Sequence, residues 1–141
     1  GEPVAHKEVA FGEEMDMDAM MNSPMHGRPA GMRFTINGAT YAPHRATLTS
    51  RRGDVERWTI RNGTDMDHPF HLHGTQFQVI ERASDGTRTS EPFRAWRDTV
   101  NVRSGETVTI LVTQDMPGER MFHCHILEHE DLGMMGTLKV V

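Results

Sequence analysis

Histidines that can bind a metal gather in two short segments of the sequence. Residues 68–74 read His-Pro-Phe-His-Leu-His-Gly, and residues 123–129 begin with His-Cys-His and end with His129. Together the two segments hold six of the nine histidines and the only cysteine. Imidazole and thiolate are favoured ligands of first-row transition metals in proteins. Chemistry at a metal centre is therefore the first function to consider.

The parity of these positions separates the ligands into two sets if both segments are extended. Side chains two residues apart on a strand share a face, and neighbouring side chains point to opposite faces. Cys124 then points away from its flanking histidines, and His68, an odd number of residues from His71, can do likewise. The sequence predicts two sites placed back to back. One of them would collect the imidazoles of His71, His73, His123 and His125.

The other set is typical of blue copper. It combines the Cys124 thiolate with His68, with His129 and with a methionine of residues 133–135. Two imidazoles, one thiolate and a weak axial thioether suit a copper ion that transfers electrons. Zinc is the main competing metal, but a thioether adds little to a zinc site and structural zinc usually has more thiolates. A Cys-His nucleophilic pair is a third interpretation, although the spacing demands no hydrolase arrangement.

Length and charge narrow the classes of protein to which the chain can belong. A chain of 141 residues suits one domain, because two cores of half that size would be marginally stable. The net charge is −5 and the arginines are scattered, so we expect no nucleic-acid partner. No apolar run approaches the roughly 18 to 20 residues of a membrane-spanning helix, and no signal peptide is recognisable at the start. We therefore expect no membrane span.

Short clusters of β-branched and aromatic residues predict an all-β fold. Turn signals such as Asn37-Gly38 and Ser104-Gly105 separate the clusters at regular intervals, which is typical of a Greek-key sandwich or barrel. No long amphipathic helix is predicted. The predicted strands cover residues 4–11, 33–36, 55–61, 70–81, 99–102, 106–113, 120–125 and 137–141.

Residues 12–31 form an acidic, methionine-rich stretch that predicts an irregular linker, so we expect the N-terminal part to add little to the core. Five of the eleven methionines lie between Met15 and Met25. Thioethers favour Cu(I), so capture of cuprous ions is one hypothesis, and a flexible linker or an apolar contact is the other. Met66, between Asp65 and Asp67 and just before His68, offers a second donor site of the same kind.

The two histidine segments together resemble the signatures of the last domain of multicopper oxidases, in particular those of the bacterial laccase and cuprous oxidase branch. The likeness continues through residues 74–77 and 96–100 and covers about residues 34 to 141. It implies a cupredoxin domain over residues 33–141. Residues 1–32 would be an N-terminal strand and a methionine-rich linker from a preceding domain. A periplasmic or secreted location follows from the resemblance alone.

The resemblance also implies a role for each ligand. Type 1 copper would accept electrons from phenolic donors or Cu(I), and Cys124 would pass them to a trinuclear cluster that reduces dioxygen to water. Glu130 resembles a carboxylate that delivers protons to this cluster, and an exposed loop acid is the alternative. The implied ligands are His68, Cys124, His129 and axial Met134 for type 1 copper, His71 for type 2 copper, and His73, His123 and His125 for the type 3 pair.

Only half of the trinuclear ligands are present in this chain. The family takes the remaining imidazoles from two further His-x-His segments of an N-terminal domain, and the isolated His6, His26 and His44 cannot replace them. The expected partners are N-terminal cupredoxin domains of the same oxidase or another subunit, a small-molecule electron donor and dioxygen. The chain alone is expected to be inactive in dioxygen reduction. A stand-alone blue-copper electron-transfer domain is the alternative function.

Two further residues near the motifs have structural interpretations. Trp96 is interpreted as a core or interface aromatic residue. Asp98 is expected to fix a loop through hydrogen bonds.

Overall fold

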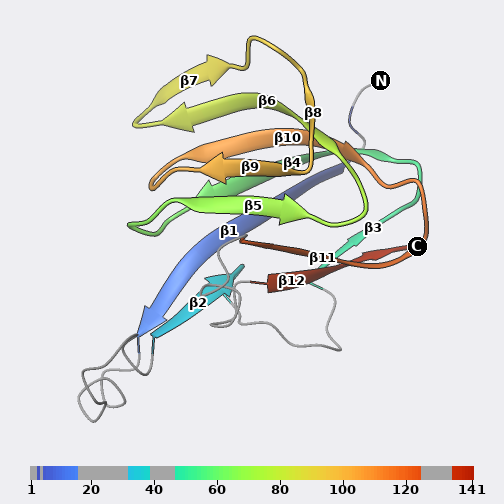
Figure 1. Ribbon diagram of the computed structural model, residues 1–141, viewed down its shortest axis with the longest axis horizontal. Helices are drawn as coiled ribbons and strands as arrows, with labels where there is room; N and C mark the ends of the chain where they lie inside the picture. The colour runs from blue at the N-terminus through green and yellow to red at the C-terminus, as the bar shows by residue number, and fades with distance from the viewer. Residues whose placement is uncertain (1–2, 4, 16–31, 39–46, 125–134) are drawn as a thin grey trace.

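The computed structural model describes residues 3, 5–15, 32–38, 47–124 and 135–141, which form two β-sheets (Figure 1). The described residues form strands and turns and include no helix that could cross a membrane. The seven-stranded sheet contains β1 (Ala5–Met15), β2 (Met32–Ile36), β4 (Val55–Asn62), β6 (Phe77–Ser84), β7 (Thr87–Ser90), β8 (Trp96–Arg97) and β10 (Thr107–Thr113). The five-stranded sheet contains β3 (Leu48–Ser50), β5 (His68–Leu72), β9 (Thr99–Val102), β11 (Gly118–Cys124) and β12 (Met135–Val140).

The hydrophobic core combines residues of both sheets. In β4 and β10 buried residues alternate with more exposed ones, as expected for strands with one face on a core. Four large aromatic side chains are fully buried in the core between the sheets: Trp58, Phe70, Phe77 and Phe122. The Phe122 ring lies 6.0 Å from Trp58 and 6.1 Å from Phe70, measured between ring centroids. The predicted all-β sandwich is confirmed.

The first strand is longer and more central than the sequence indicated. β1 continues to Met15. It pairs in parallel with β4 on one side and antiparallel with β2 on the other. Val9 and Phe11 belong to the core, so the expectation that the N-terminal part adds little to the core is wrong. The physical reason is the alternation at residues 9 and 11, which buries one face of an otherwise polar strand. The division of the chain at residue 32 stays a prediction.

The predicted strand over residues 70–81 is in fact two strands of different sheets. β5 ends at Leu72 and β6 begins at Phe77, and Gly74 between them has a φ of 79°, a left-handed conformation that favours glycine. Three short strands, β3, β7 and β8, were not predicted. All four residues of β7 are exposed and β8 has only two residues, so neither carries an alternating apolar pattern.

Gly136 lies against the ring of Phe122, its partner in the register of β11 and β12. A Cβ atom added to Gly136 would lie 2.5 Å from the Phe122 Cζ atom, and the buried ring packs on Trp58 and Phe70. We therefore expect Gly136→Ala to lower the free energy of unfolding by about 1 to 3 kcal/mol, the usual cost of overpacking. Urea unfolding of the chain measures this change.

Gly63→Ala is the matched control for this prediction. Its added Cβ would lie 3.5 Å from the carbonyl oxygen of Phe11, which is an ordinary van der Waals contact. We expect the free energy of unfolding to change by less than about 1 kcal/mol in this control. Equal losses in the two variants would contradict the packing argument.

Polar residues occupy both ends of the buried face of β4. Glu56 accepts hydrogen bonds from the Ser50 hydroxyl at 2.6 Å and from the Trp58 indole at 3.1 Å, and it pairs with the Lys7 ammonium at 2.5 Å. Because Ser50 belongs to β3, this carboxylate connects the two sheets. Asn62, at the other end of β4, donates a hydrogen bond of 3.0 Å to the Val102 carbonyl of β9 and forms a second connection.

Candidate metal centre

The register of β5 and β11 brings the predicted ligands together. These strands are antiparallel neighbours, with His71 directly opposite His123 and Phe70 opposite Cys124. Residues directly opposite in such a pair have Cβ atoms about 4.5 to 5.5 Å apart, so the side chains of His71 and His123 meet. His73 follows the last residue of β5, and its amide donates a hydrogen bond of 3.0 Å to the Met121 carbonyl of β11. Two adjacent strands thus position three imidazoles.

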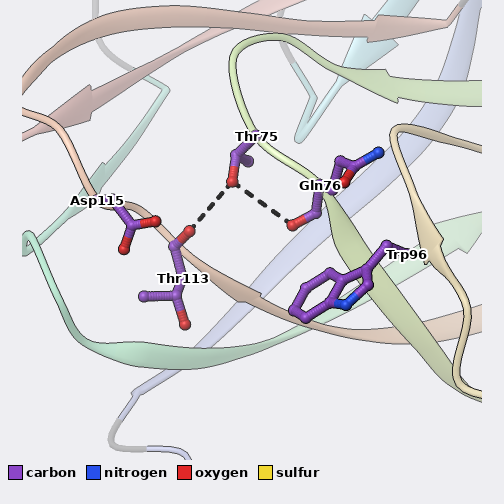
Figure 2. Close-up of a pocket in the computed structure, with 5 residues that line it drawn as sticks. All are labelled: Thr75, Gln76, Trp96, Thr113 and Asp115. Carbon is purple, nitrogen blue, oxygen red and sulfur yellow. Dashed lines mark hydrogen bonds between the residues drawn. The ribbon is translucent and has the colours of Figure 1, made fainter.

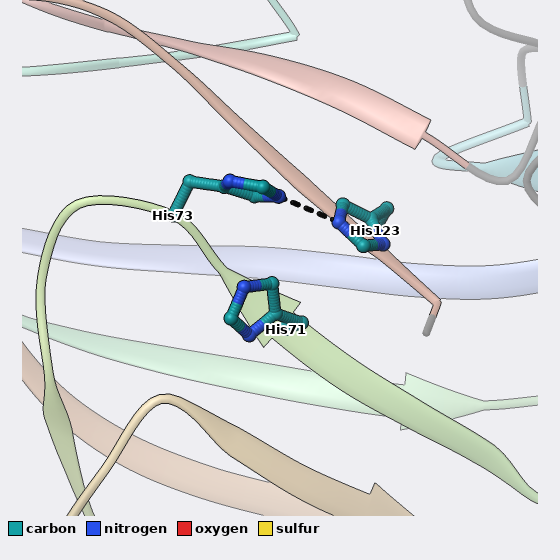
Figure 3. Close-up of side chains that lie close together, drawn as sticks. All are labelled: His71, His73 and His123. Carbon is teal, nitrogen blue, oxygen red and sulfur yellow. Dashed lines mark hydrogen bonds between the residues drawn. The ribbon is translucent and has the colours of Figure 1, made fainter. Parts of the chain in front are cut away.

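Figure 3 shows the rings of His71, His73 and His123 lying close together. One ligand atom from each lies within 4.8 Å of the others, and their ring centroids are 4.6 to 5.3 Å apart. The Nε2 atoms of His73 and His123 are 2.7 Å apart, so one ring donates a hydrogen bond to the other. His123 is buried, His71 half-buried and His73 exposed. Three of the four imidazoles predicted for this site thus lie together, and the fourth, His125, lies outside the described residues.

The hydrogen-bond contacts of the His71 ring are those expected of a metal-binding histidine. Its Nδ1 atom lies 2.9 Å from the Asp98 carbonyl oxygen and 2.9 Å from the Thr99 hydroxyl. A carbonyl oxygen can only accept, so Nδ1 carries the proton and Nε2 carries the lone pair. Metal-binding histidines usually donate their other N–H in this way. The same Asp98 carbonyl accepts the Leu72 amide at 3.1 Å. The Asp98 carboxylate accepts only a hydrogen bond of 3.1 Å from the neighbouring Thr99 hydroxyl among the described residues, so its loop-fixing role stays a prediction.

His68 lies on the opposite face of β5. Along this strand His68, Phe70 and Leu72 are buried, whereas the intervening Pro69 and His71 are partly exposed. His68 is fully buried, and its ring lies 5.4 Å from that of Phe11. Its Nε2 atom is 2.8 Å from the Thr64 hydroxyl. His68 and His71 therefore face opposite sides of β5, as parity predicted.

The remaining predicted residues are described in part or not at all. Cys124 is the last residue of β11, and its backbone position opposite Phe70 is described. The methionine-rich residues 16–31 lie outside the described residues. The same holds for four predicted site residues, namely His125, His129, Glu130 and Met134. The assignment of all eight ligands to individual copper ions stays a prediction.

Two aspartates lie shortly before His68 in the sequence. Asp65 and Asp67 flank Met66, whose side chain is 43% exposed, and all three precede His68. Burial raises the pKa of Glu13 at the end of β1, and the charge and hydrogen bonding of Asp65 raise it further. A second donor site at Met66, two residues before His68, stays a prediction.

Trp96 is exposed over 64% of its surface and is therefore no core residue, which leaves the interface interpretation as a prediction. It borders a hollow that is also lined by Thr75, Gln76, Thr113 and Asp115 (Figure 2). The Thr75 hydroxyl donates a hydrogen bond of 3.2 Å to the Thr113 carbonyl at this hollow. Thr75 follows His73 by two residues, so the hollow begins close in sequence to the exposed imidazole.

Comparisons with known proteins agree with a copper centre. Residues 13–141 match the multicopper oxidase family. The chain is 46% identical over 142 residues to a multicopper oxidase of Staphylococcus aureus, covering 98% of this chain and 31% of that protein. It is 42% identical over 103 residues to a laccase of Haloferax volcanii, covering 72% of this chain and 18% of that protein.

Solved structures give the same result. The multicopper oxidase of Campylobacter jejuni, described as a metallo-oxidase, superposes with a TM-score of 0.90 and 46% identity, covering 99% of this chain and 30% of that one. The chain thus spans about a third of the length of the Staphylococcus aureus and Campylobacter jejuni relatives, which it matches over nearly all of its own length. A match over residues 13–141, joined to a two-sheet β-sandwich and a cluster of imidazoles, identifies the family. The chain belongs to the multicopper oxidase family, which implies copper as its metal.

Proposed function

We propose that this chain is a copper-binding cupredoxin domain of an oxidase that takes electrons from a small-molecule donor and reduces dioxygen to water. The observation that carries the proposal is the convergence of His71, His73 and His123 on one side of β5 while His68 is buried on the other side. One sheet would thereby hold two copper sites of different kinds. Bound copper would supply one-electron transfer at the site of His68 and dioxygen reduction at the imidazole cluster.

The proposed ligands follow from this division. Cys124 pairs with Phe70, and His68 lies two residues from Phe70 on β5, which supports a shared site for His68 and Cys124. Cys124 is also bonded to His123 through the backbone, so consecutive residues would connect the two sites for electron transfer. The proposed sets are His68, Cys124, His129 and Met134 for type 1 copper, His71 for type 2 copper, and His73, His123 and His125 for type 3 copper.

A partner is needed to complete the imidazole cluster. The chain spans about a third of its relatives, which supports preceding cupredoxin domains of the same oxidase, or another subunit, as the source of the missing ligands. His73 is exposed, so a second domain can reach it. Glu130 is proposed to deliver protons to the completed cluster. A periplasmic or secreted location is proposed from the resemblance to bacterial relatives.

The electron donor is proposed to be Cu(I) or a phenol. Met66 is partly exposed between two aspartates beside His68, and a thioether with carboxylates suits a cuprous ion. The description of the Campylobacter jejuni relative as a metallo-oxidase supports a metal donor. The name of the Haloferax volcanii relative, a laccase, supports a phenolic donor.

Copper titration of the chain tests the proposal. We expect one tightly bound copper with an intense thiolate-to-copper absorption band, and no oxygen uptake with a phenol or Cu(I). His68→Gln should remove the band, whereas His71→Gln should keep it because His71 lies on the opposite face of β5. Replacement of the exposed His6 by Gln is the control and should change nothing.

Two other outcomes would change the conclusion. A colourless protein that prefers zinc would overturn the copper assignment. Oxygen uptake by the chain alone, with four coppers per assembly, would show that copies of this chain complete the cluster without another domain.

A further inference from the structure

We infer that Asn62 and Thr64 are positioning residues that fix the tautomer of His68, with the proton on Nε2 and the lone pair on Nδ1 for a metal. The inference depends on the proposed function only for the identity of that metal. Asn62 ends β4 and Thr64 lies in the turn before β5, and both are buried, with 1% and 7% exposure. The contacts among these three residues determine where each hydrogen lies.

The orientation of the Asn62 amide comes first. Its Nδ2 atom lies 2.7 Å from the Met66 carbonyl oxygen and 3.0 Å from the Val102 carbonyl oxygen. Carbonyl oxygens only accept, so both hydrogens of the amide nitrogen are used on them. The Oδ1 atom consequently faces Thr64, where it accepts the backbone N–H of Thr64 at 3.0 Å. Three backbone groups thus fix the amide orientation.

The single hydrogen of the Thr64 hydroxyl is then assigned by elimination. Its Oγ1 atom lies 2.7 Å from Asn62 Oδ1, 3.0 Å from the Met66 carbonyl and 2.8 Å from His68 Nε2. The two oxygens only accept, so the hydroxyl must donate to one of them. If the hydroxyl donated to His68 instead, Thr64 Oγ1 would lie close to Asn62 Oδ1 and to the Met66 carbonyl oxygen with no hydrogen in either contact. Thr64 therefore accepts from His68, and Nε2 carries the proton.

This assignment makes the two histidines of β5 opposite tautomers. His68 carries its lone pair on Nδ1, whereas His71 donates from Nδ1 to the Asp98 carbonyl and carries its lone pair on Nε2. One five-residue strand thus presents different ring nitrogens to its two faces. A neutral imidazole without such a contact would populate both tautomers, and the fraction in the wrong tautomer lowers the apparent affinity for metal.

The turn that carries Thr64 is itself held in place. The Ser104 hydroxyl donates a hydrogen bond of 2.6 Å to the Thr64 carbonyl, and the Ser104 amide donates one of 3.1 Å to the Asp67 carboxylate. The Thr64 hydroxyl is therefore positioned by contacts from three parts of the chain, namely β4, its own turn and the turn after β9. A fixed acceptor of this kind is what the second ring nitrogen of a metal-binding histidine usually has.

Nitrogen NMR of the metal-free chain tests the tautomer directly. Long-range proton–nitrogen spectra of histidine-labelled protein distinguish the protonated nitrogen from the unprotonated one, and His68→Gln identifies the His68 signals. We expect an Nε2–H tautomer in the original chain and in Thr64→Ser, and a mixture in Thr64→Val. An Nδ1–H tautomer in the original chain would overturn the inference without any variant, and regardless of whether the chain proves to be an oxidase.

Copper affinity tests the consequence of the tautomer. Thr64→Val should bind copper about 10-fold to 100-fold more weakly, as is typical when a partner of a metal-binding histidine is removed. Thr64→Ser should restore the affinity because it keeps the hydroxyl. Thr137→Val is the control, since it removes a similarly buried hydroxyl from β12, two strands away from β5. Unchanged affinity and tautomer in a folded Thr64→Val would refute the positioning role.

Discussion

Replacement of Cys124 by serine is expected to abolish the intense visible absorption of the copper-loaded chain. The band requires electron donation from a thiolate sulfur to copper, and a serine hydroxyl neither ionises near neutral pH nor donates in this way. Cys124 pairs with Phe70 and lies next in sequence to His123, so no other described position joins the two proposed sites in this manner. The loss should therefore be complete rather than partial.

Metal analysis separates this loss from a general failure to bind copper. In Cys124→Ser the imidazoles of His71, His73 and His123 remain 4.6 to 5.3 Å apart between ring centroids and should still bind a weakly coloured Cu(II) ion. Paramagnetic resonance of copper-loaded Cys124→Ser should accordingly show an ordinary Cu(II) signal and no blue-copper signal. Persistence of the visible band in this variant would refute the proposed ligand set.

Replacement of Glu56 by alanine is expected to lower the free energy of unfolding by about 3 to 5 kcal/mol, the usual effect of removing one partner of a buried ion pair. Glu56 is 2% exposed and receives hydrogen bonds from Ser50 and Trp58. Its loss leaves these donors unpaired and leaves the half-buried Lys7 ammonium without its carboxylate. Because Ser50 belongs to the other sheet, the same change removes a connection between the sheets.

Urea unfolding measures this loss, and Glu8→Ala is the matched control. Glu8 pairs with Arg61 at 3.1 Å, but both side chains are more than half exposed. Water and salt screen such a pair, so the control should lose no more than about 1 kcal/mol. Equal losses at Glu56 and Glu8 would show that burial of the carboxylate has no special effect.

The division of the ligands into two sites could be predicted because the two-residue period of a strand is local information. The placement of His68 and His71 on opposite faces of β5 follows from their separation alone. The direct pairing of His71 with His123 could not be predicted in this way. Strand register depends on contacts between residues far apart in the chain, and the sequence segments themselves do not specify it.

The residues around the ligands were harder to recognise. β4 places the polar residues Glu56 and Asn62 on the same buried face as Trp58 and Ile60, and this alternation was visible in the sequence. A polar residue at an apolar parity position indicates a buried hydrogen-bond network, and that signal would have identified Asn62. Thr64 carried no comparable signal, because its contact with His68 depends on the conformation of a turn.

The position of the terminal strands within the sheets also bears on the synthesis of the protein. β1 lies between β2 and β4, and β12 lies between β3 and β11, so each sheet has an interior strand close to one end of the described chain. A ribosome releases residues from the N-terminus onward, and β3 must wait for β12, its parallel partner, to emerge. β11, which carries His123 and Cys124, also lacks one neighbour until then. We therefore expect copper to bind only after β12 has left the ribosome and has paired with β3 and β11.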